Sequence, residues 1–236
     1  MVRITKFASA SRALRDSSVL HKMLRAVAQL GRWINCSGPT MECGGFEPSS
    51  ALGKLRQFRA LRGDRDLSLL HVGVLWGADG DPLRAGLMGK QVAKEFEGVT
   101  EVAKEDVRQL AASVAQFRSE ADWLSAEAQD GGYSAEARGR MREICETQLA
   151  PRADELERAW ADTIAEWRGT LHFYAERVDP QLGFETTAER FLTAIERFRK
   201  ELSEAAREVA TNPERFANPL VSSAAAALRM DRSSTT

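Results

Sequence analysis

Cysteine and histidine are the residues of this sequence whose chemistry would be easiest to recognise, and they are few. The 236-residue chain contains 3 Cys and 3 His. Cys36 and Cys43, with His21 or His71, are the one combination that would resemble a metal site, but their spacing matches no standard zinc pattern. The number of cysteines is odd and Cys145 lies far from the others, which argues against a disulfide framework and for a reducing compartment. We therefore interpret the cysteines as ordinary thiols and predict no metal and no cofactor.

Recognisable catalytic motifs are missing as well. No glycine-rich phosphate loop precedes a helical segment, and no nucleophile has a base partner at a motif spacing. His71 has no second ligand or nucleophile near it in the sequence, so we expect it to be packed in the core. No apolar run approaches the roughly 18 residues that a membrane span needs. The sequence predicts a protein that is not an enzyme and has no membrane span.

Basic and acidic residues are unevenly distributed, although the net charge is only −1. Residues 1–65 contain 12 Lys and Arg against 4 Asp and Glu, which leaves 21 against 30 in residues 66–236. An asymmetry of this size is typical of a surface that binds a partner of opposite charge. Nucleic acid, an anionic membrane and an acidic protein surface all fit this charge.

The positions of the apolar residues predict helices over most of the chain. They recur at alternating steps of three and four, the pattern of helices that are buried along one seam. We predict an all-α, elongated domain with long antiparallel, coiled-coil-like helices. The expected helices cover residues 7–34, 49–63, 84–129, 134–149, 151–178 and 186–211. In the helix over 49–63 we expect Phe58 to point inward, and Thr186 to Glu189 reads as a capping box for the last helix.

Four blocks of sequence follow one known pattern in the right order. Residues 14–35, LRDSSVLHKMLRAVAQLGRWIN, match L-R-x-S-x-x-L-x-x-L-L-x-x-V-L-x-x-G-N-x-x-N, and Gly45-Phe46 followed by SSALGKL matches G-F-x-x-x-x-L-x-K-L. Leu69-Leu70-His71 and the segment ERFL at residues 189–192 match two further blocks. From about residue 14 to about residue 209, the chain thus resembles the formin homology 2 domain of the formin actin-assembly family. In that family the segment around residues 67–76 is helical, which decides between helix and strand for this apolar run.

The resemblance implies a pocket in the first third of the chain. The G-N-x-x-N element lies in the part of the formin domain called the post, which receives the N-terminal lasso of the partner subunit. Gly31, Trp33 and Asn35 occupy this element here, and Gly45 and Phe46 follow it. Arg32 replaces the first Asn, and a long cation that cannot accept a hydrogen bond stands where the family has a short amide.

The resemblance also implies actin as the partner. Arg59 aligns with a basic residue that the family uses to contact actin, and Arg56 and Arg62 lie within two turns of it. These three arginines are the expected actin-binding residues, in a protein of the cytoplasm and the actin cytoskeleton. Nucleic acid is not an expected partner. The 7 Pro are scattered, so we expect no profilin site in this chain.

The resemblance covers the C-terminal half of the formin domain or slightly more. We expect residues 1–211 to form a partial domain without the lasso, the linker and the first part of the knob, and residues 212–236 to form a tail with a short helix. Without a lasso we expect no closed ring dimer, although self-association through the post is compatible with the sequence.

One alternative rests on the N-terminal residues alone. Residues 1–38 are rich in Arg and Ser, are amphipathic and contain one acid, Asp16, as mitochondrial presequences do. The alternative is a structural helical protein, in the mitochondrion, whose basic N-terminal helix is a targeting signal or binds anionic lipid.

Overall fold

The computed structural model describes residues 1–35, 46–59, 66–129 and 132–216, and these residues form an all-α fold. They contain no strand, and the only ladder contact among them is an isolated bridge between Arg59 and Ser68. The helices are α1 (Val2–Asp16), α2 (Ser18–Asn35), α3 (Pro48–Leu52), α4 (Leu69–Gly77), α5 (Pro82–Glu95), α6 (Glu97–Val102), α7 (Val107–Glu127), α8 (Ala135–Ile144), α9 (Ala150–Phe173), α10 (Gly183–Thr211) and α11 (Pro213–Phe216), with a π-helical turn, η1 (Cys145–Leu149), between α8 and α9. Within the apolar run over 67–76, the residues from Leu69 on are helical, as predicted.

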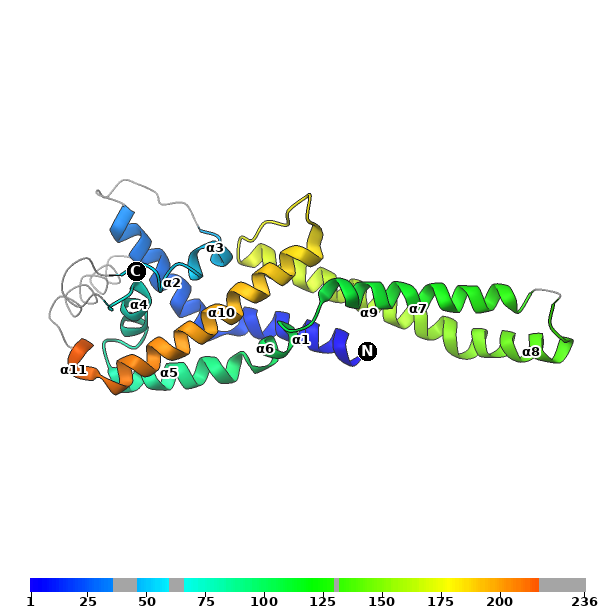
Figure 1. Cartoon of the computed structure of the whole chain (residues 1–236), viewed down its shortest axis with the longest axis horizontal. Coiled ribbons are helices and arrows are strands. Elements are labelled where there is room, and N and C mark those ends of the chain that lie inside the picture. The colour runs from blue at the N-terminus through cyan, green and yellow to red at the C-terminus, as the bar shows by residue number, and fades with distance from the viewer. Residues whose placement is uncertain (36–45, 60–65, 130–131, 217–236) are drawn as a thin grey trace, which may run out of the picture.

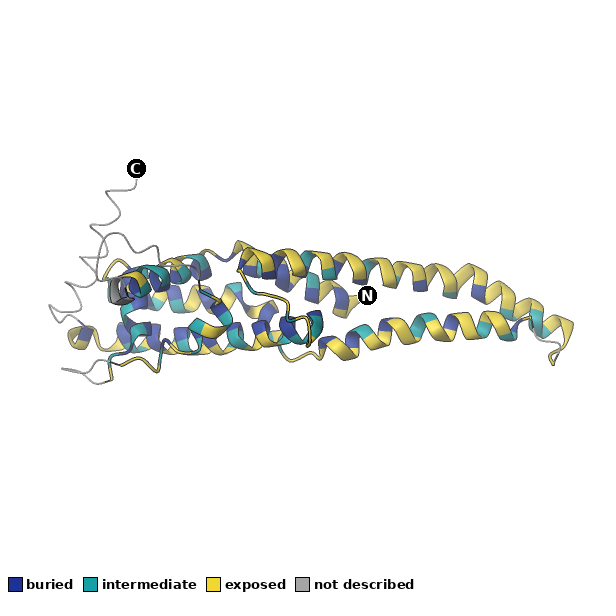
Figure 2. Cartoon of the chain, turned by 90° about the horizontal axis from the view of Figure 1, so that it is seen from above, coloured by how far each residue is buried: buried dark blue, intermediate teal, exposed yellow. Residues whose placement is uncertain are grey.

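The fold is elongated and has two parts (Figure 1). At one end, α10 runs through a body that also contains α1 to α6 and the second half of α9. At the other end, α7 pairs with α8 and the first half of α9 to form an arm that projects from the body (Figures 1 and 2). The prediction of an elongated domain with long antiparallel helices is confirmed.

Helix α10 is the centre of the body. Its buried face includes the residues spaced three and four apart that the sequence predicted: Ala188, Phe191, Ile195, Phe198, Leu202, Ala205 and Val209. Phe184, Thr187, Leu192 and Ala206 are buried as well. Helices α3, α4, α5 and α7 pack on it. The apolar face of α10 packs against the apolar faces of the helices around it. Burial of these faces is the main source of stability in a fold of this kind.

The N-terminal helix α1 belongs to the core. Phe7 stacks on Trp167 of α9 with 4.7 Å between the ring centroids, and the Trp167 indole N–H donates to the Phe7 carbonyl over 2.8 Å. Near the end of α1, the Tyr174 hydroxyl donates to the Leu14 carbonyl over 2.5 Å. These contacts make α1 part of the folded domain, as the formin resemblance implies and as a cleavable presequence would not require.

Two of the long helices expected from periodicity are interrupted. The helix over 7–34 breaks at Ser17, whose Oγ accepts from the Leu20 amide over 3.1 Å and donates to Glu95 over 2.6 Å. The helix over 84–129 is divided into α5, α6 and α7. The break before α7 lies at Asp106, whose side chain accepts from the Gln109 amide over 2.9 Å and caps the new helix. Side chains that cap a new helix therefore override the apolar periodicity at both places.

Several predicted helix ends were wrong. The helix expected over 151–178 ends at Phe173, and the one expected over 7–34 begins at Val2. Helix α10 begins at Gly183 rather than at Thr186, and Glu189 does not close a capping box on its own helix, because its carboxylate accepts from the Val107 amide of α7 over 3.0 Å. Helix α3 ends at Leu52, and Phe58 is 60% exposed instead of pointing inward. After α3 the chain turns back toward α4 through the Arg59–Ser68 bridge.

Candidate functional site

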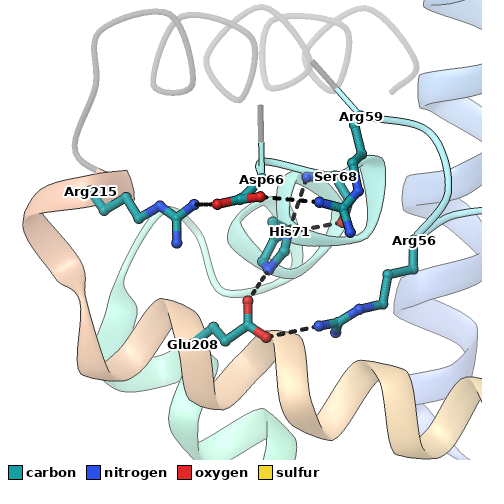
Figure 3. A pocket seen from close by; sticks show the side chains of 7 residues that line it. All are labelled: Arg56, Arg59, Asp66, Ser68, His71, Glu208 and Arg215. Carbon is teal, nitrogen blue, oxygen red and sulfur yellow. Dashed lines mark hydrogen bonds and ion pairs between the residues drawn. The ribbon is translucent and has the colours of Figure 1, made fainter. Parts of the chain in front are cut away.

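A polar pocket of about 220 Å³ lies where the segment after α3, the start of α4 and the C-terminal end of α10 meet (Figure 3). Its lining is almost entirely charged or hydrogen-bonding. The lining residues are Arg56, Arg59, Asp66, Ser68, His71, Glu208 and Arg215. Three guanidinium groups thus face two carboxylates across a small cavity.

A chain of hydrogen bonds forms the floor of the pocket. The Ser68 amide donates to Nδ1 of His71 over 3.1 Å, so Nδ1 is the unprotonated nitrogen and Nε2 carries the proton. Nε2 donates to Glu208 Oε2 over 2.8 Å, and Nη2 of Arg56 donates to Glu208 Oε1 over 2.9 Å. Glu208 on α10 therefore holds both α4 and the segment after α3.

The position of His71 follows from its place in α4. It is the third residue of a helix whose N-cap is Ser68, and a side chain at this position can reach back to the N-cap amide, as Glu or Gln does in a capping box. The ring is 2% exposed and stacks on Phe216 with 5.4 Å between the centroids. The prediction that His71 is a packed histidine is thus confirmed by its burial.

Burial and neighbouring charges shift the pKa values of His71 and Glu208 on the pocket floor. Burial lowers the pKa of His71 below its usual value, and Arg56 and Arg215 act in the same direction, against the opposing effect of Glu208. For Glu208, burial acts to raise the pKa, but the hydrogen bonds from His71 and Arg56 outweigh it and lower the pKa. The floor therefore combines a neutral imidazole with an ionised carboxylate at neutral pH.

The rim of the pocket is more exposed. Arg59 Nη1 lies 3.1 Å from Asp66 Oδ1, and Arg215 Nη2 lies 3.2 Å from Asp66 Oδ2, so one carboxylate is shared by two cations (Figure 3). The Arg215 guanidinium also lies over the Phe216 ring, 5.7 Å from its centroid. Asp66 therefore holds Arg59 and Arg215 on the same side of the pocket.

The expected actin-binding arginines have different environments. Arg59 lies on the rim with its side chain 54% exposed. Arg56 is 25% exposed and pairs with Glu208 and, at 3.3 Å, with Glu204. Its charge is therefore balanced by two carboxylates of α10. Arg62 lies outside the described residues.

The sequence did not indicate Glu208 or Arg215 as partners of these arginines. Glu208 is one of many acids on the solvent side of a periodic helix, and Arg215 follows the proline that ends it, so neither carries a local signal. Only the S-x-x-H spacing of Ser68 and His71 could have been read as a cap.

The residues expected to form the post pocket are only partly described. Gly31 lies in α2, and a Cβ added there would meet no atom within 4 Å. Phe46 packs against the main core cluster. Trp33 and Asn35 have described backbones but not side chains, and Gly45 lies outside the described residues, so the pocket itself stays a prediction.

Cys36 and Cys43 also lie outside the described residues. Among the residues that are described, no three His, Cys, Asp or Glu side chains gather in a way that would hold a metal ion. Within the same ranges, no helix has the length and apolar character required to cross a membrane.

Comparison with known protein families gives one match. A family model described as Formin Homology 2 Domain matches residues 1–203. No curated protein matches the chain. The matched residues include the α3–α4 side of the polar pocket, whereas Glu208 and Arg215 follow the matched region.

Proposed function

The chain belongs to the formin homology 2 family, and on this premise we propose that it is an actin-binding module that acts by holding actin rather than by covalent chemistry. The family is one of actin assembly, and the proposal for this chain names the surface that makes the contact. That surface is the rim of the polar pocket, with Arg59 as the contacting residue, and the resemblance adds Arg62 as a second contact.

The exposure of Arg59 is the observation that carries this proposal. Its guanidinium is at the rim, where a partner can reach it, and its only described ion pair is with Asp66, whose carboxylate is itself shared with Arg215. An incoming carboxylate from actin can therefore bind Arg59 without leaving Asp66 unpaired. Replacing the Asp66 carboxylate by one from actin costs little free energy, because the Arg59 guanidinium keeps a charged partner throughout the exchange.

Arg56 has a different role in this proposal. Its side chain is three-quarters buried and bridges to Glu208 and Glu204, so it positions the segment that carries Arg59. Replacing it would disturb the pocket floor and would weaken binding indirectly. For this reason a binding test should change Arg59 and Arg62 and leave Arg56 in place.

The test is co-sedimentation of the chain with actin filaments at low and at physiological ionic strength. Arg59→Asp should weaken binding by about fivefold, since one exposed charge contact contributes up to about 1 kcal/mol, and Arg59→Asp with Arg62→Asp should weaken it further. Binding of the wild type should decrease as salt rises, because exposed charges are screened beyond about 8 Å at physiological ionic strength.

Arg140→Asp is the matched control, because Arg140 is an exposed arginine on the arm, far from the pocket. It should bind like the wild type. Equal pelleting of the wild type and the double charge reversal would show that this rim is not the actin site. Failure of the wild type to pellet even at low salt would overturn the proposed function itself.

Cytoplasm and the actin cytoskeleton are the proposed location, in keeping with the family. The mitochondrial alternative has less support, because α1 contributes Phe7 and Leu14 to the contacts with α9 and the family match begins at residue 1. Self-association through the post, with Gly31, Trp33, Asn35, Gly45 and Phe46, stays a separate prediction.

A further inference from the structure

A second concave surface lies between α5 and α10, away from the polar pocket. We call it the α5/α10 groove. It has a volume of about 680 Å³ and is lined by Leu83, Gly86, Leu87, Gly89, Lys90 and Ala93 of α5 and by Arg199, Ser203, Arg207 and Ala210 of α10. Leu83 is 77% exposed and Leu87 is 64% exposed, so two large apolar side chains one turn apart face solvent.

The groove exists because the two helices touch through small residues. A Cβ added to Gly86 would lie 3.1 Å from the Ala210 Cβ, and one added to Gly89 would lie 2.9 Å from the Ala206 Cβ. Helices that approach this closely leave a trough beside the contact line, with a floor of glycine and alanine. The larger residues, including Leu87, form its walls.

The charged residues of the groove are all basic. Lys90, Arg199 and Arg207 line it, and no carboxylate is among its described lining residues. Arg199 pairs with Glu196, whereas neither Lys90 nor Arg207 has an ion pair within the described part of the chain. An apolar trough with a basic rim is complementary to a helix that presents an apolar residue between acids.

The chain itself contains such a helix face near the far end of α7. Glu120, Trp123 and Glu127 follow one another at steps of three and four, so they lie on one side of the helix. The Trp123 side chain is 60% exposed, although tryptophan usually finds a partner. Within the described residues, neither Glu120 nor Glu127 forms an ion pair. We call this the arm face.

We propose that the arm face of one copy of the chain docks in the α5/α10 groove of a second copy. Within one molecule the two surfaces do not meet, because the arm projects to the end of the molecule opposite α5 (Figure 1). The same projection makes the arm accessible to another copy. Trp123 fills the trough beside Leu87, and Glu120, one turn before it, meets Lys90 on the basic rim.

The spacing of the two surfaces agrees with an antiparallel arrangement of α7 on α5. Leu83, Leu87 and Lys90 are separated by steps of four and three, and Glu127, Trp123 and Glu120 have the same steps when read backwards. Trp123 then faces Leu87, and Glu120 faces Lys90. Glu127 comes to the Leu83 end of the groove, beyond the contact of Gly86 with Ala210, so Glu120 is the acid that meets a cation.

This contact is heterologous, because the groove of one copy binds a different surface of the next. Repetition of such a contact produces open chains or a ring instead of a dimer that closes on itself. It uses neither the post residues nor the rim of the polar pocket, so it is independent of the proposed actin contact. One helix face in one groove is a small interface, and we expect weak, concentration-dependent association.

Sedimentation equilibrium over a concentration series reaching the high micromolar range tests the proposal. The wild type should associate at low salt and less so at high salt. Leu87→Glu in the groove and Trp123→Ala on the arm should each raise the dissociation constant by about tenfold or more. Leu182→Glu changes another exposed leucine outside both surfaces and should associate like the wild type. Circular dichroism checks that each variant keeps its helices.

Two mixing experiments make the test specific. Leu87→Glu retains an intact arm face and Trp123→Ala retains an intact groove, so the two variants, each monomeric alone, should bind each other one to one. Lys90→Glu and Glu120→Lys should each weaken association, and the chain that carries both changes should recover it.

A wild type that stays monomeric throughout the series would overturn the proposal. Association that persists in both Leu87→Glu and Trp123→Ala would also overturn it, because another surface must then be responsible. If Trp123→Ala alone keeps the affinity of the wild type, the groove binds something other than the arm face. None of these results depends on actin, so the proposed function is tested separately.

Discussion

Lowering the pH should destabilise the fold through His71. The Ser68 amide needs an unprotonated Nδ1, and the ring is 2% exposed, so the folded state favours neutral imidazole. Protonation of Nδ1 would place its N–H opposite the Ser68 N–H, and it would create a buried imidazolium cation near Arg56. Because the pKa of His71 is lowered in the folded state, the unfolded chain binds more protons just below pH 6.5. The free energy of unfolding therefore decreases as the pH falls through this range.

The size of the effect follows from the linkage between protonation and folding. One proton taken up only by the unfolded chain changes the free energy of unfolding by at most about 1.4 kcal/mol per pH unit. From pH 7.5 to pH 5.5, roughly one unit below the ordinary histidine pKa, the loss due to His71 has an upper limit of about 1.4 kcal/mol. The lowered pKa of Glu208 contributes in the same direction, but only at a lower pH where that carboxylate is protonated.

His71→Gln is the variant that isolates this contribution. Glutamine at the third helical position caps the Ser68 amide as in a capping box, and it does not titrate. Urea unfolding followed by circular dichroism at both pH values should give a wild type that loses about 1 kcal/mol more than His71→Gln, since all other titrating groups are common to both proteins. If both proteins lose the same free energy, the buried imidazole is not what makes the fold sensitive to pH.

Two further predictions concern the contact between α1 and α9. Trp167→Phe should lower the free energy of unfolding by about 2–3 kcal/mol, because it removes the hydrogen bond to Phe7 and part of the buried ring. Trp123→Phe on the exposed arm is the control and should change it by less than about 0.5 kcal/mol. Equal effects of the two changes in urea unfolding would contradict the packing of α1. Tyr174→Phe should cost about 1–3 kcal/mol in the same assay, since it removes the hydroxyl that donates to the buried Leu14 carbonyl, and an unchanged midpoint would show that this hydrogen bond contributes nothing.

The fold class and the buried face of α10 could be predicted because they depend on periodicity. Every residue of the seam from Ala188 to Val209 is buried, and α4 is a helix although its composition is also typical of a strand. Periodicity does not report where a helix is interrupted. Ser17 and Asp106 interrupt long apolar patterns because their side chains cap the next helix, and a single Ser or Asp in such a pattern is not a strong signal.

The polar pocket could be predicted only in part, and the reason is distance along the chain. Arg59 was identified by resemblance and does lie on an exposed rim. Its neighbours Glu208 and Arg215 reach the rim only because α10 returns across the whole body and α11 follows it (Figure 1). A contact over 137 residues, such as that between His71 and Glu208, has no local pattern in the sequence.

The polar pocket extends beyond the part of the chain that the family model matches. The family match ends at residue 203, but the floor of the polar pocket needs Glu208, and the stacking on His71 needs Phe216, which is buried. Without these two residues, His71 would lose the acceptor of its Nε2 proton, and Arg56 would lose one of its two carboxylates. Arg59 would then be carried by a segment with fewer contacts to α10. The placement of the proposed actin contact therefore depends on residues beyond the part of the chain by which the family is recognised.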